Sequence, residues 1–454
     1  MIMCQKLSSK NIMADPIQNA YIVAVDMGYG HQRAAYPLEN IAALPEGWQT
    51  ETRIISANNY PLIPRSDRIR WALTRKTYEL ISRVQGFPIL GKRIFRLMDA
   101  VEAIQPFYPK QDLSSSIFSQ KIVRNLVNGG FGKHLIDTLN RKPLPLIATF
   151  PLPALMAEIH NYKGEIYTLC TDTDIARGWV PVNAKTSRIK YLAPTVRVKE
   201  RLKLYGVPAS NIFVTGFPVP PMPQEKLGER IVRLDPSGAF RKRYEKLISL
   251  YIDSDSLRNS SGQPVTVVFS IGGAGAQVDI GLKILRSLSM QVRNNKFRLI
   301  LVAGTSTFAS DQFEAMIHEL DLDNCRGKSV DVLYYKDKYM YFREFNRILE
   351  DADVLWSKPS ELSFYAALGL PIIMSPPLGP QEESNRSWLL MMGAGFEQYD
   401  PRYANEWLVD WLHSGWLAKA AVNGFINAPR DATLRIADLV LRGVKNEIDD
   451  VNFV

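Results

Sequence analysis

The sequence has few cysteines and histidines and no long apolar run. Its 454 residues include only five histidines and three cysteines, Cys4, Cys170 and Cys325, which lie far apart. This spacing argues against a disulfide framework or a structural zinc site, and it favours a reducing compartment. No window approaches the roughly 20 apolar residues of a membrane span. The first 15 residues are polar and resemble no secretory signal, so we expect a cytoplasmic protein.

The composition is that of an ordinary globular protein with a basic excess. Apolar residues make up 46% and charged residues 22%, and the net charge is +9. Between residues 65 and 96, basic side chains alternate with aromatic and aliphatic ones, a pattern typical of amphipathic helices at an anionic membrane surface. A solvated basic face over an ordinary core fits the pattern equally well. We expect no nucleic-acid partner, because no RNA- or DNA-binding motif accompanies the charge.

Short apolar runs alternate with helical segments along the whole chain, which predicts parallel α/β sheets. Strands are expected at 21–25, 51–55, 146–149, 166–170, 190–192 and 212–215, and then at 265–270, 297–303, 329–335, 354–356 and 370–375. The proline-rich run 218–223 reads as a linker. A charged helix is expected after it, at 230–252. We therefore predict two Rossmann-like domains. They are residues 18–218, with a helical basic insertion at about 60–140, and residues 219–425; a helical tail, 426–454, could pack on the first domain.

A glycine turn follows the first expected strand. Gly28 and Gly30 lie in it, at the sheet edge that faces the ligand cleft in doubly wound folds. His31 comes next, at a helix N-terminus, where the helix dipole disfavours the imidazolium form. A neutral histidine can act as a general base. The alternative is a histidine that caps its own turn.

Two aspartates follow the strand at 166–170. Asp172 or Asp174 could orient His31 or hold an acceptor hydroxyl, although capping of the next segment explains each equally well. Arg177 follows closely, and we expect it to line the same cleft.

A second glycine turn stands between the strand at 265–270 and a helix. Gly272, Gly273, Gly275 and Ala276 would let a phosphate approach the backbone, with the helix N-terminus facing it. Such turns also serve helix–sheet packing alone. Gly304, which ends the next strand, is expected in the same nucleotide-sugar site.

The segment 356–395 holds the densest group of candidate ligand-binding residues. Lys358 suits a phosphate, and Glu361 suits the hydroxyls of a ribose. Gln381, Glu382 and Asn385 lie about one turn apart at the head of another helix, so they can converge on one ligand. The alternatives are an ordinary helix cap for the first two and a solvated helix start for the other three.

Taken in order, these motifs resemble the two-domain GT-B glycosyltransferases. The most similar groups are the monogalactosyldiacylglycerol synthases, the diacylglycerol glucosyltransferases and the peptidoglycan lipid-intermediate N-acetylglucosaminyltransferase. The similar segments are G-Y-G-H-Q-R-A-A at 28–35, T-D with a later Trp at 171–179, G-F-P-V at 216–219, I-G-G-A-G-A at 271–276, K-P at 358–359 and G-P-Q-E-E-S-N at 379–385.

The resemblance implies two Rossmann-like domains facing across a cleft and an inverting sugar transfer. The donor would be a nucleotide diphosphate sugar, with UDP as the expected nucleotide, held on the second domain. The acceptor would be a hydroxyl of a lipid or other hydrophobic molecule, and His31 would take its proton. The resemblance implies no cofactor and no metal, and it implies a peripheral position on the inner face of a membrane.

The chain departs from the family pattern at one position that matters. Phe364 and Tyr365 stand where the family has a glutamate before A-L-x-x-G-L-P. Glu361 could substitute for it from one turn earlier. The departure leaves two alternatives open, a sugar-nucleotide epimerase or hydrolase of the same fold and a non-catalytic relic that binds a nucleotide or a partner.

Overall fold

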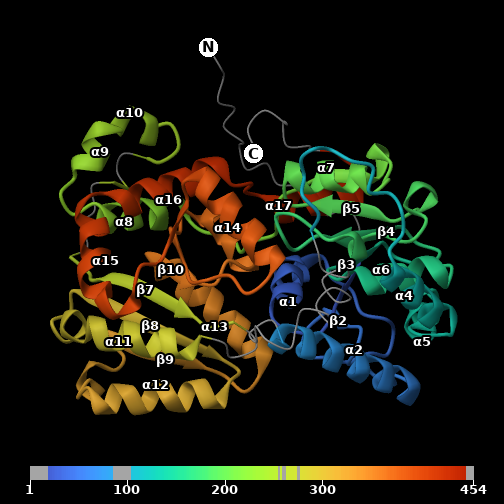
Figure 1. Ribbon diagram of the computed structural model, residues 1–454, viewed down its shortest axis with the longest axis horizontal. Coiled ribbons are helices and arrows are strands. Elements are labelled where there is room, and N and C mark those ends of the chain that lie inside the picture. The colour runs from blue at the N-terminus through green and yellow to red at the C-terminus, as the bar shows by residue number, and fades with distance from the viewer. Residues whose placement is uncertain (1–18, 85–103, 254–255, 258–261, 273–276, 446–454) are drawn as a thin grey trace.

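The computed structural model describes residues 19–84, 104–253, 256–257, 262–272 and 277–445. It contains two sheets of six strands each, and neighbouring strands are parallel throughout. Figure 1 shows the sheets in separate halves of the molecule, each with helices packed around it. The predicted fold class, α/β with two Rossmann-like domains, is confirmed.

The first sheet has the order β2-β1-β3-β4-β5-β6. Its strands are β1 (Tyr21–Ala24), β2 (Ile55–Ser56), β3 (Leu146–Ala148), β4 (Ile166–Leu169), β5 (Lys190–Ala193) and β6 (Ile212–Val214). Strands β1, β3 and β4 are buried along their whole length, as expected for apolar runs covered on both faces. The strand predicted at 51–55 is much shorter, because the hydroxyl of Thr52 bonds the backbone N–H of Ile54 at 3.2 Å and turns the chain.

Helices surround this sheet on both faces (Figure 1). They are α1 (Gly30–Ala35), α2 (Arg65–Val84), α4 (Phe118–Asn128), α5 (Lys133–Leu139), α6 (Pro151–Ile159) and α7 (Val196–Leu204). Helix α1 follows β1 directly and starts the first domain's half of the cleft.

The second sheet has the order β12-β11-β10-β7-β8-β9. Its strands are β7 (Val265–Ser270), β8 (Phe297–Gly304), β9 (Val330–Tyr334), β10 (Val354–Ser357), β11 (Ile372–Met374) and β12 (Gly395–Glu397). The principal helices are α8 (Gln224–Leu234), α11 (Val278–Arg293), α12 (Thr307–Glu319), α13 (Lys338–Asp351), α14 (Pro380–Met392), α15 (Ala404–His413) and α16 (Trp416–Asn427). A 3-10 helix, η6, spans Glu361–Leu368. Neither β12 nor α16 was predicted from the sequence.

The long charged helix predicted at 230–252 is broken into three. Helix α8 ends at Leu234, and two short helices follow, α9 (Ala239–Arg243) and α10 (Glu245–Ile248). The buried carboxylate of Asp235 accepts the backbone N–H of Arg241 at 2.9 Å. Gly238 adopts a positive φ of 68°. An aspartate that caps a new helix start and a left-handed glycine together end the first helix.

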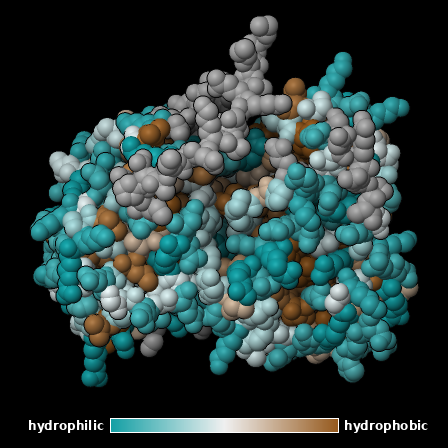
Figure 2. All heavy atoms as spheres, turned by 180° about the vertical axis from the view of Figure 1, so that it is seen from behind, coloured by the Kyte–Doolittle hydropathy of each residue, from teal (hydrophilic) through white to brown (hydrophobic). Residues whose placement is uncertain are grey.

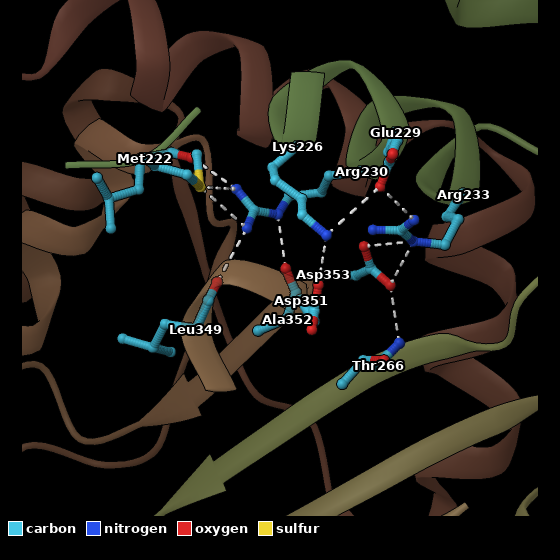
Figure 3. Close-up of polar contacts among 11 residues, drawn as sticks. Met222, Lys226, Glu229, Arg230, Arg233, Thr266, Leu349, Asp351, Ala352 and Asp353 are labelled. Carbon is cyan, nitrogen blue, oxygen red and sulfur yellow. Dashed lines mark hydrogen bonds and ion pairs between the residues drawn. The ribbon is translucent and has the colours of Figure 1, made fainter. Parts of the chain in front are cut away.

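One buried side chain of α8, Arg230, contacts the sulfur of Met222 in the interdomain linker at 3.4 Å and also bonds the rest of the second domain (Figure 3). Its guanidinium donates to the carbonyl of Ala352 at 2.6 Å, of Leu368 at 2.6 Å and of Leu349 at 3.1 Å. These carbonyls lie at the C-terminal ends of α13 and η6, where helical partners are missing. Burial lowers the pKa of Arg230 to about 10, so the side chain remains charged at neutral pH.

The C-terminal helix α17 (Ala432–Arg442) returns to the first domain. Its Arg435 donates to the carbonyl of Thr215, just after β6, at 3.0 Å. Nearby, the rings of Phe217 and Phe364 stack at 4.5 Å with an interplanar angle of 8°. One apolar cluster contains buried residues of both sheets, so the domains share a core at this contact.

The face shown in Figure 2 is mostly hydrophilic, with hydrophobic side chains gathered in separate patches over both halves. None of the helices in the described ranges has both the length and the apolar character needed to cross a bilayer.

Candidate functional site

The candidate site lies where the carboxyl ends of the two sheets approach each other, the usual ligand position in open α/β sheets. The turn between β1 and α1 forms the first domain's side of it. Gly28 adopts a positive φ of 75°, which lets the chain reverse there. Asp26 in this turn forms an ion pair with Lys338 at the start of α13. The turn is therefore tied to both domains.

His31, the predicted base, has one ring nitrogen engaged. Its Nδ1 lies 2.7 Å from the carbonyl oxygen of Thr149, just after β3. Only an N–H can bond a carbonyl, so in the neutral ring Nδ1 carries the hydrogen and Nε2 offers a lone pair. The ring packs edge-on against Phe150 at 4.8 Å. Burial lowers the pKa of His31 to about 4, against the opposing effects of Thr149 and Glu361, so the imidazole is neutral at physiological pH.

Asp172 follows β4 and meets the second domain. Its Oδ1 accepts a hydrogen bond of 3.0 Å from the side-chain amide of Asn385. Burial raises the pKa of Asp172 to about 6; the bond from Asn385 opposes this rise, and the charges of Glu361 and Glu382 add to it. The carboxylate is therefore ionised at neutral pH and takes up a proton slightly below it.

Asn385 lies on α14 and is fully buried. Besides its bond to Asp172, its oxygen accepts the backbone N–H of Thr173 at 2.9 Å, and its nitrogen donates to the carbonyl of Pro359 at 3.2 Å. We predicted that this amide binds the nucleotide sugar. In the structure it bridges the two domains.

Lys358 and Glu382 face each other as an ion pair, and Glu382 also accepts the backbone N–H of Leu378 at 2.7 Å. A Cβ on Gly272 would lie 2.7 Å from Cε of Lys358, so the lysine stem rests on that glycine. The structure thus joins three predicted donor-site residues. Gln381 lies beside Glu382 in the first turn of α14. The predictions on Gly273, Gly275 and Ala276 fall outside the described residues.

Glu361, the predicted ribose ligand, points to the first domain. A Cβ on Gly30 would lie 3.1 Å from its Oε2, and its Oε1 lies 3.4 Å from Nη1 of Arg33. Arg33 is buried, with its guanidinium 4.2 Å from the ring centroid of Phe345 and bonded to the hydroxyl of Tyr341. No sequence motif singled out Arg33, because its partners come from a different domain.

Gly304 ends β8 as predicted, but the first domain covers it. A Cβ on Gly304 would lie 2.5 Å from the hydroxyl oxygen of Tyr29. That hydroxyl accepts the backbone N–H of Thr305 at 2.9 Å. Tyr29 lies between the two glycines of the G-Y-G turn, and it was not among the residues predicted from the sequence.

We expected Asp174 and Arg177 at the cleft, but both side chains are engaged inside the first domain. Asp174 accepts two hydrogen bonds from Arg201, at 2.9 Å and 2.8 Å, and both side chains are buried. Arg177 is also buried and donates to backbone carbonyls, among them that of Ser114 at 2.9 Å. Both residues serve the packing of the first domain, because a buried charge must be paired or hydrogen-bonded.

Phe364 and Tyr365, at the place of the family's glutamate, are buried. Phe364 is the residue stacked on Phe217 of the first domain. Within the described ranges, no group of three or more His, Cys, Asp or Glu side chains is arranged to hold a metal ion.

Comparisons with known proteins give a family match and several distant relatives. A family model described as "Domain of unknown function (DUF6938)" matches residues 251–384. A processive diacylglycerol beta-glucosyltransferase of Bacillus subtilis (strain 168) is 24% identical over 311 residues, which is 67% of each chain. One of Staphylococcus haemolyticus (strain JCSC1435) is 22% identical over 260 residues, or 56% of each chain. The chain thus spans two thirds or less of these relatives.

These relatives confirm the predicted resemblance to diacylglycerol glucosyltransferases and agree with the predicted class, a glycosyltransferase. Among solved structures, UDP-GlcNAc 2-epimerase from Neisseria meningitidis bound to UDP-GlcNAc is 10% identical, with a TM-score of 0.42 over 75% of this chain and 86% of that one. MurG from Acinetobacter baumannii is 15% identical, with a TM-score of 0.40 over 78% and 89%. Likenesses this distant say nothing about what the chain binds.

Proposed function

We propose that the chain is an inverting glycosyltransferase that moves a sugar from a nucleotide diphosphate sugar to a hydroxyl of a lipid. The acceptor oxygen attacks the anomeric carbon, the bond from that carbon to the diphosphate oxygen breaks, and the acceptor proton passes to a base. A single displacement of this kind inverts the anomeric configuration. The sequence similarity to diacylglycerol glucosyltransferases supports the class of acceptor.

The proposal rests on one observation, the hydrogen bond and the protonation state of His31. Its Nδ1–H is directed at the Thr149 carbonyl, and its pKa of about 4 keeps the ring neutral. Nε2 is therefore the atom that would take the acceptor proton. Asp172 is the candidate for holding the acceptor hydroxyl, because its carboxylate is ionised at neutral pH.

The donor would bind on the second domain, over Gly272, Lys358 and the start of α14. Helix α14 begins at Pro380, and Lys358 faces its first turn through Glu382. A diphosphate here would meet the lysine charge and the positive end of a helix of 13 residues. Both would stabilise the departing diphosphate without the need for a metal.

The lipid would approach over α2 and α4, inside the basic insertion. Helix α4 exposes Phe118, Ile122 and Leu126, which lie four residues apart along one face, with Lys121 and Arg124 exposed beside them. Exposed apolar side chains flanked by basic ones suit an anionic lipid surface. Helix α2 also exposes apolar side chains, Ile69 and Leu73, by 61% and 65%. The contact of Arg70 with the Gly129 carbonyl, at 3.1 Å, joins the two helices.

A second candidate function is a non-catalytic relic that binds a nucleotide or a partner. It is favoured by the stack of Phe364 on Phe217, which occupies the position of the family's ribose-binding glutamate. An apolar ring cannot bond a ribose hydroxyl.

The test is incubation with UDP-glucose, labelled in the sugar, and diacylglycerol in mixed vesicles, followed by separation of the products. A labelled glycolipid supports the proposal. A released or epimerised sugar would instead identify the hydrolase or epimerase alternative. Nucleotide binding without any product, for UDP-, GDP-, TDP- and ADP-sugars alike, would leave the relic as the function.

A further inference from the structure

Tyr29 crosses from the first domain into the second and ends at the backbone of β8. Its hydroxyl accepts the Thr305 N–H at 2.9 Å and lies 3.0 Å from the Thr305 hydroxyl. The ring packs on Tyr341 at 5.0 Å and on Phe342 at 5.8 Å, both on α13. Only 8% of the side chain surface of Tyr29 remains exposed.

The groups that Tyr29 occupies are those that a ligand would use. They stand at the carboxyl end of β8, an inner strand of the second sheet, one residue before the cap of α12. Ligands of open α/β sheets bind outside these strand ends. A backbone N–H and a hydroxyl that point out of the strand end would otherwise bond an oxygen of the nucleotide. The phenol oxygen of Tyr29 therefore occupies the position that an oxygen of the ligand would take.

Release of the contact would move the side chain of Tyr29 rather than its backbone. The Tyr29 carbonyl accepts the N–H of Arg33 at 2.9 Å and so begins α1. To leave Thr305, the ring must give up its contacts with Tyr341 and Phe342. The nearby Asp26–Lys338 ion pair, about a third exposed on both sides, is of the kind that contributes little to stability.

We propose that Tyr29 is a built-in competitor of the nucleotide, which closes the donor site until a nucleoside diphosphate displaces it from Thr305. The inference rests on the proposed function and extends its donor site to the end of β8, which pairs with β7, the strand that leads to Gly272. Because the nucleotide binds only when Tyr29 has left the site, its apparent affinity would be its intrinsic affinity multiplied by the fraction of time that the site is open.

The experiment measures the dissociation constants of UDP, GDP and ADP by calorimetry for the wild type, Tyr29→Phe and Tyr29→Ala. We expect Tyr29→Ala to bind one of these nucleotides at least tenfold more tightly than the wild type, with Tyr29→Phe between them. Tyr403→Ala, which removes a tyrosine that is 53% exposed, is the control and should match the wild type. In Tyr29→Phe, the Thr305 amide should exchange its hydrogen faster, even without nucleotide.

The outcomes separate this inference from the proposed function. If the wild type binds a nucleotide and Tyr29→Ala binds it equally or more weakly, the competitor role is wrong and the donor site stands. If no folded variant binds any of the three nucleotides, the donor site itself is wrong, and the inference falls with it. An unchanged Thr305 amide exchange in Tyr29→Phe would also overturn the inference, because the hydroxyl would then not protect that amide.

Discussion

The side-chain amide of Asn385 donates a hydrogen bond of 3.0 Å to the carboxylate of Asp172, and this bond joins the two domains. Asn385 is fully buried and makes two further bonds, to Thr173 and Pro359. A side chain that satisfies three groups in the interior holds the domains in one relative position. The same bond limits the rise of the Asp172 pKa.

Asn385→Ala should destabilise the protein by about 2 kcal/mol or more, because it leaves buried polar groups on both domains without partners. Urea unfolding followed by circular dichroism measures the loss. Asn128→Ala, at an exposed position on α4, is the matched control and should stay within about 0.5 kcal/mol of the wild type. Equal unfolding midpoints for the two variants would refute the bridging role.

His31→Ala should lower sugar transfer by about 100-fold or more, since proton transfer by a positioned base contributes at least that much. The dissociation constant of UDP should change little, because the ring lies on the first domain and the proposed diphosphate site lies on the second. Steady-state kinetics and calorimetry measure the two effects. His413→Ala, at an exposed position of α15, serves as control. A parallel loss of transfer and UDP binding would show that His31 is no base.

The pH dependence should identify the group that limits activity on the acid side. Asp172 has its pKa raised to about 6, and its ionised form predominates above that pH. We expect kcat/KM to fall as the pH drops below about 6. In Asp172→Asn this limb should disappear and leave a slower enzyme whose activity falls near pH 4, where His31 takes a proton. A limb near 6 that persists in the variant would exclude Asp172 as its source.

The same two groups act oppositely on stability. His31 has its pKa lowered to about 4, so the unfolded chain binds more protons between about pH 4 and the usual histidine value, and stability rises with pH there. Because the pKa of Asp172 is raised in the folded state, the folded protein keeps this proton up to a higher pH than the unfolded chain does. The contribution of Asp172 to the free energy of unfolding therefore falls as the pH rises towards 6. In His31→Ala the free energy of unfolding should therefore no longer show the rise with pH that His31 causes. Urea unfolding at several pH values between about 4 and the usual histidine pKa would detect the difference.

Replacing Phe118 and Ile122 by serine should weaken binding to vesicles of phosphatidylglycerol and phosphatidylcholine by about tenfold or more, since each apolar side chain gains roughly 1.5 kcal/mol or more on burial. Both side chains are exposed, so the fold should be unaffected. Phe308→Ser with Met290→Ser, at exposed positions of the second domain, is the matched control. Sedimentation with vesicles gives the affinities. Equal binding of both double variants would favour a merely solvated basic face.

Local pattern was sufficient for much of the fold. The run V-T-V-V-F-S predicted β7, because an apolar β-branched segment between turn residues fits a buried parallel strand. The pattern failed where the structure depends on a capping side chain or on a strand without an apolar run. Asp235 divides the helix predicted at 230–252. Strand β12 is Gly-Phe-Glu, with a single large apolar residue, so it does not stand out as a buried strand.

For the candidate site, too, the sequence predicted some features and the tertiary structure decided the others. Sequence by itself placed His31, Gly272 and Lys358 at strand ends, because residues that follow a parallel strand necessarily reach the ligand edge of its sheet. Only the tertiary structure decided what each side chain meets there. It paired Asp174 with Arg201 in the core, turned Asn385 towards Asp172, and set Tyr29 on Thr305. The partners in these last two contacts lie more than 200 residues apart and on different domains, so their contacts follow from how the two sheets pack together.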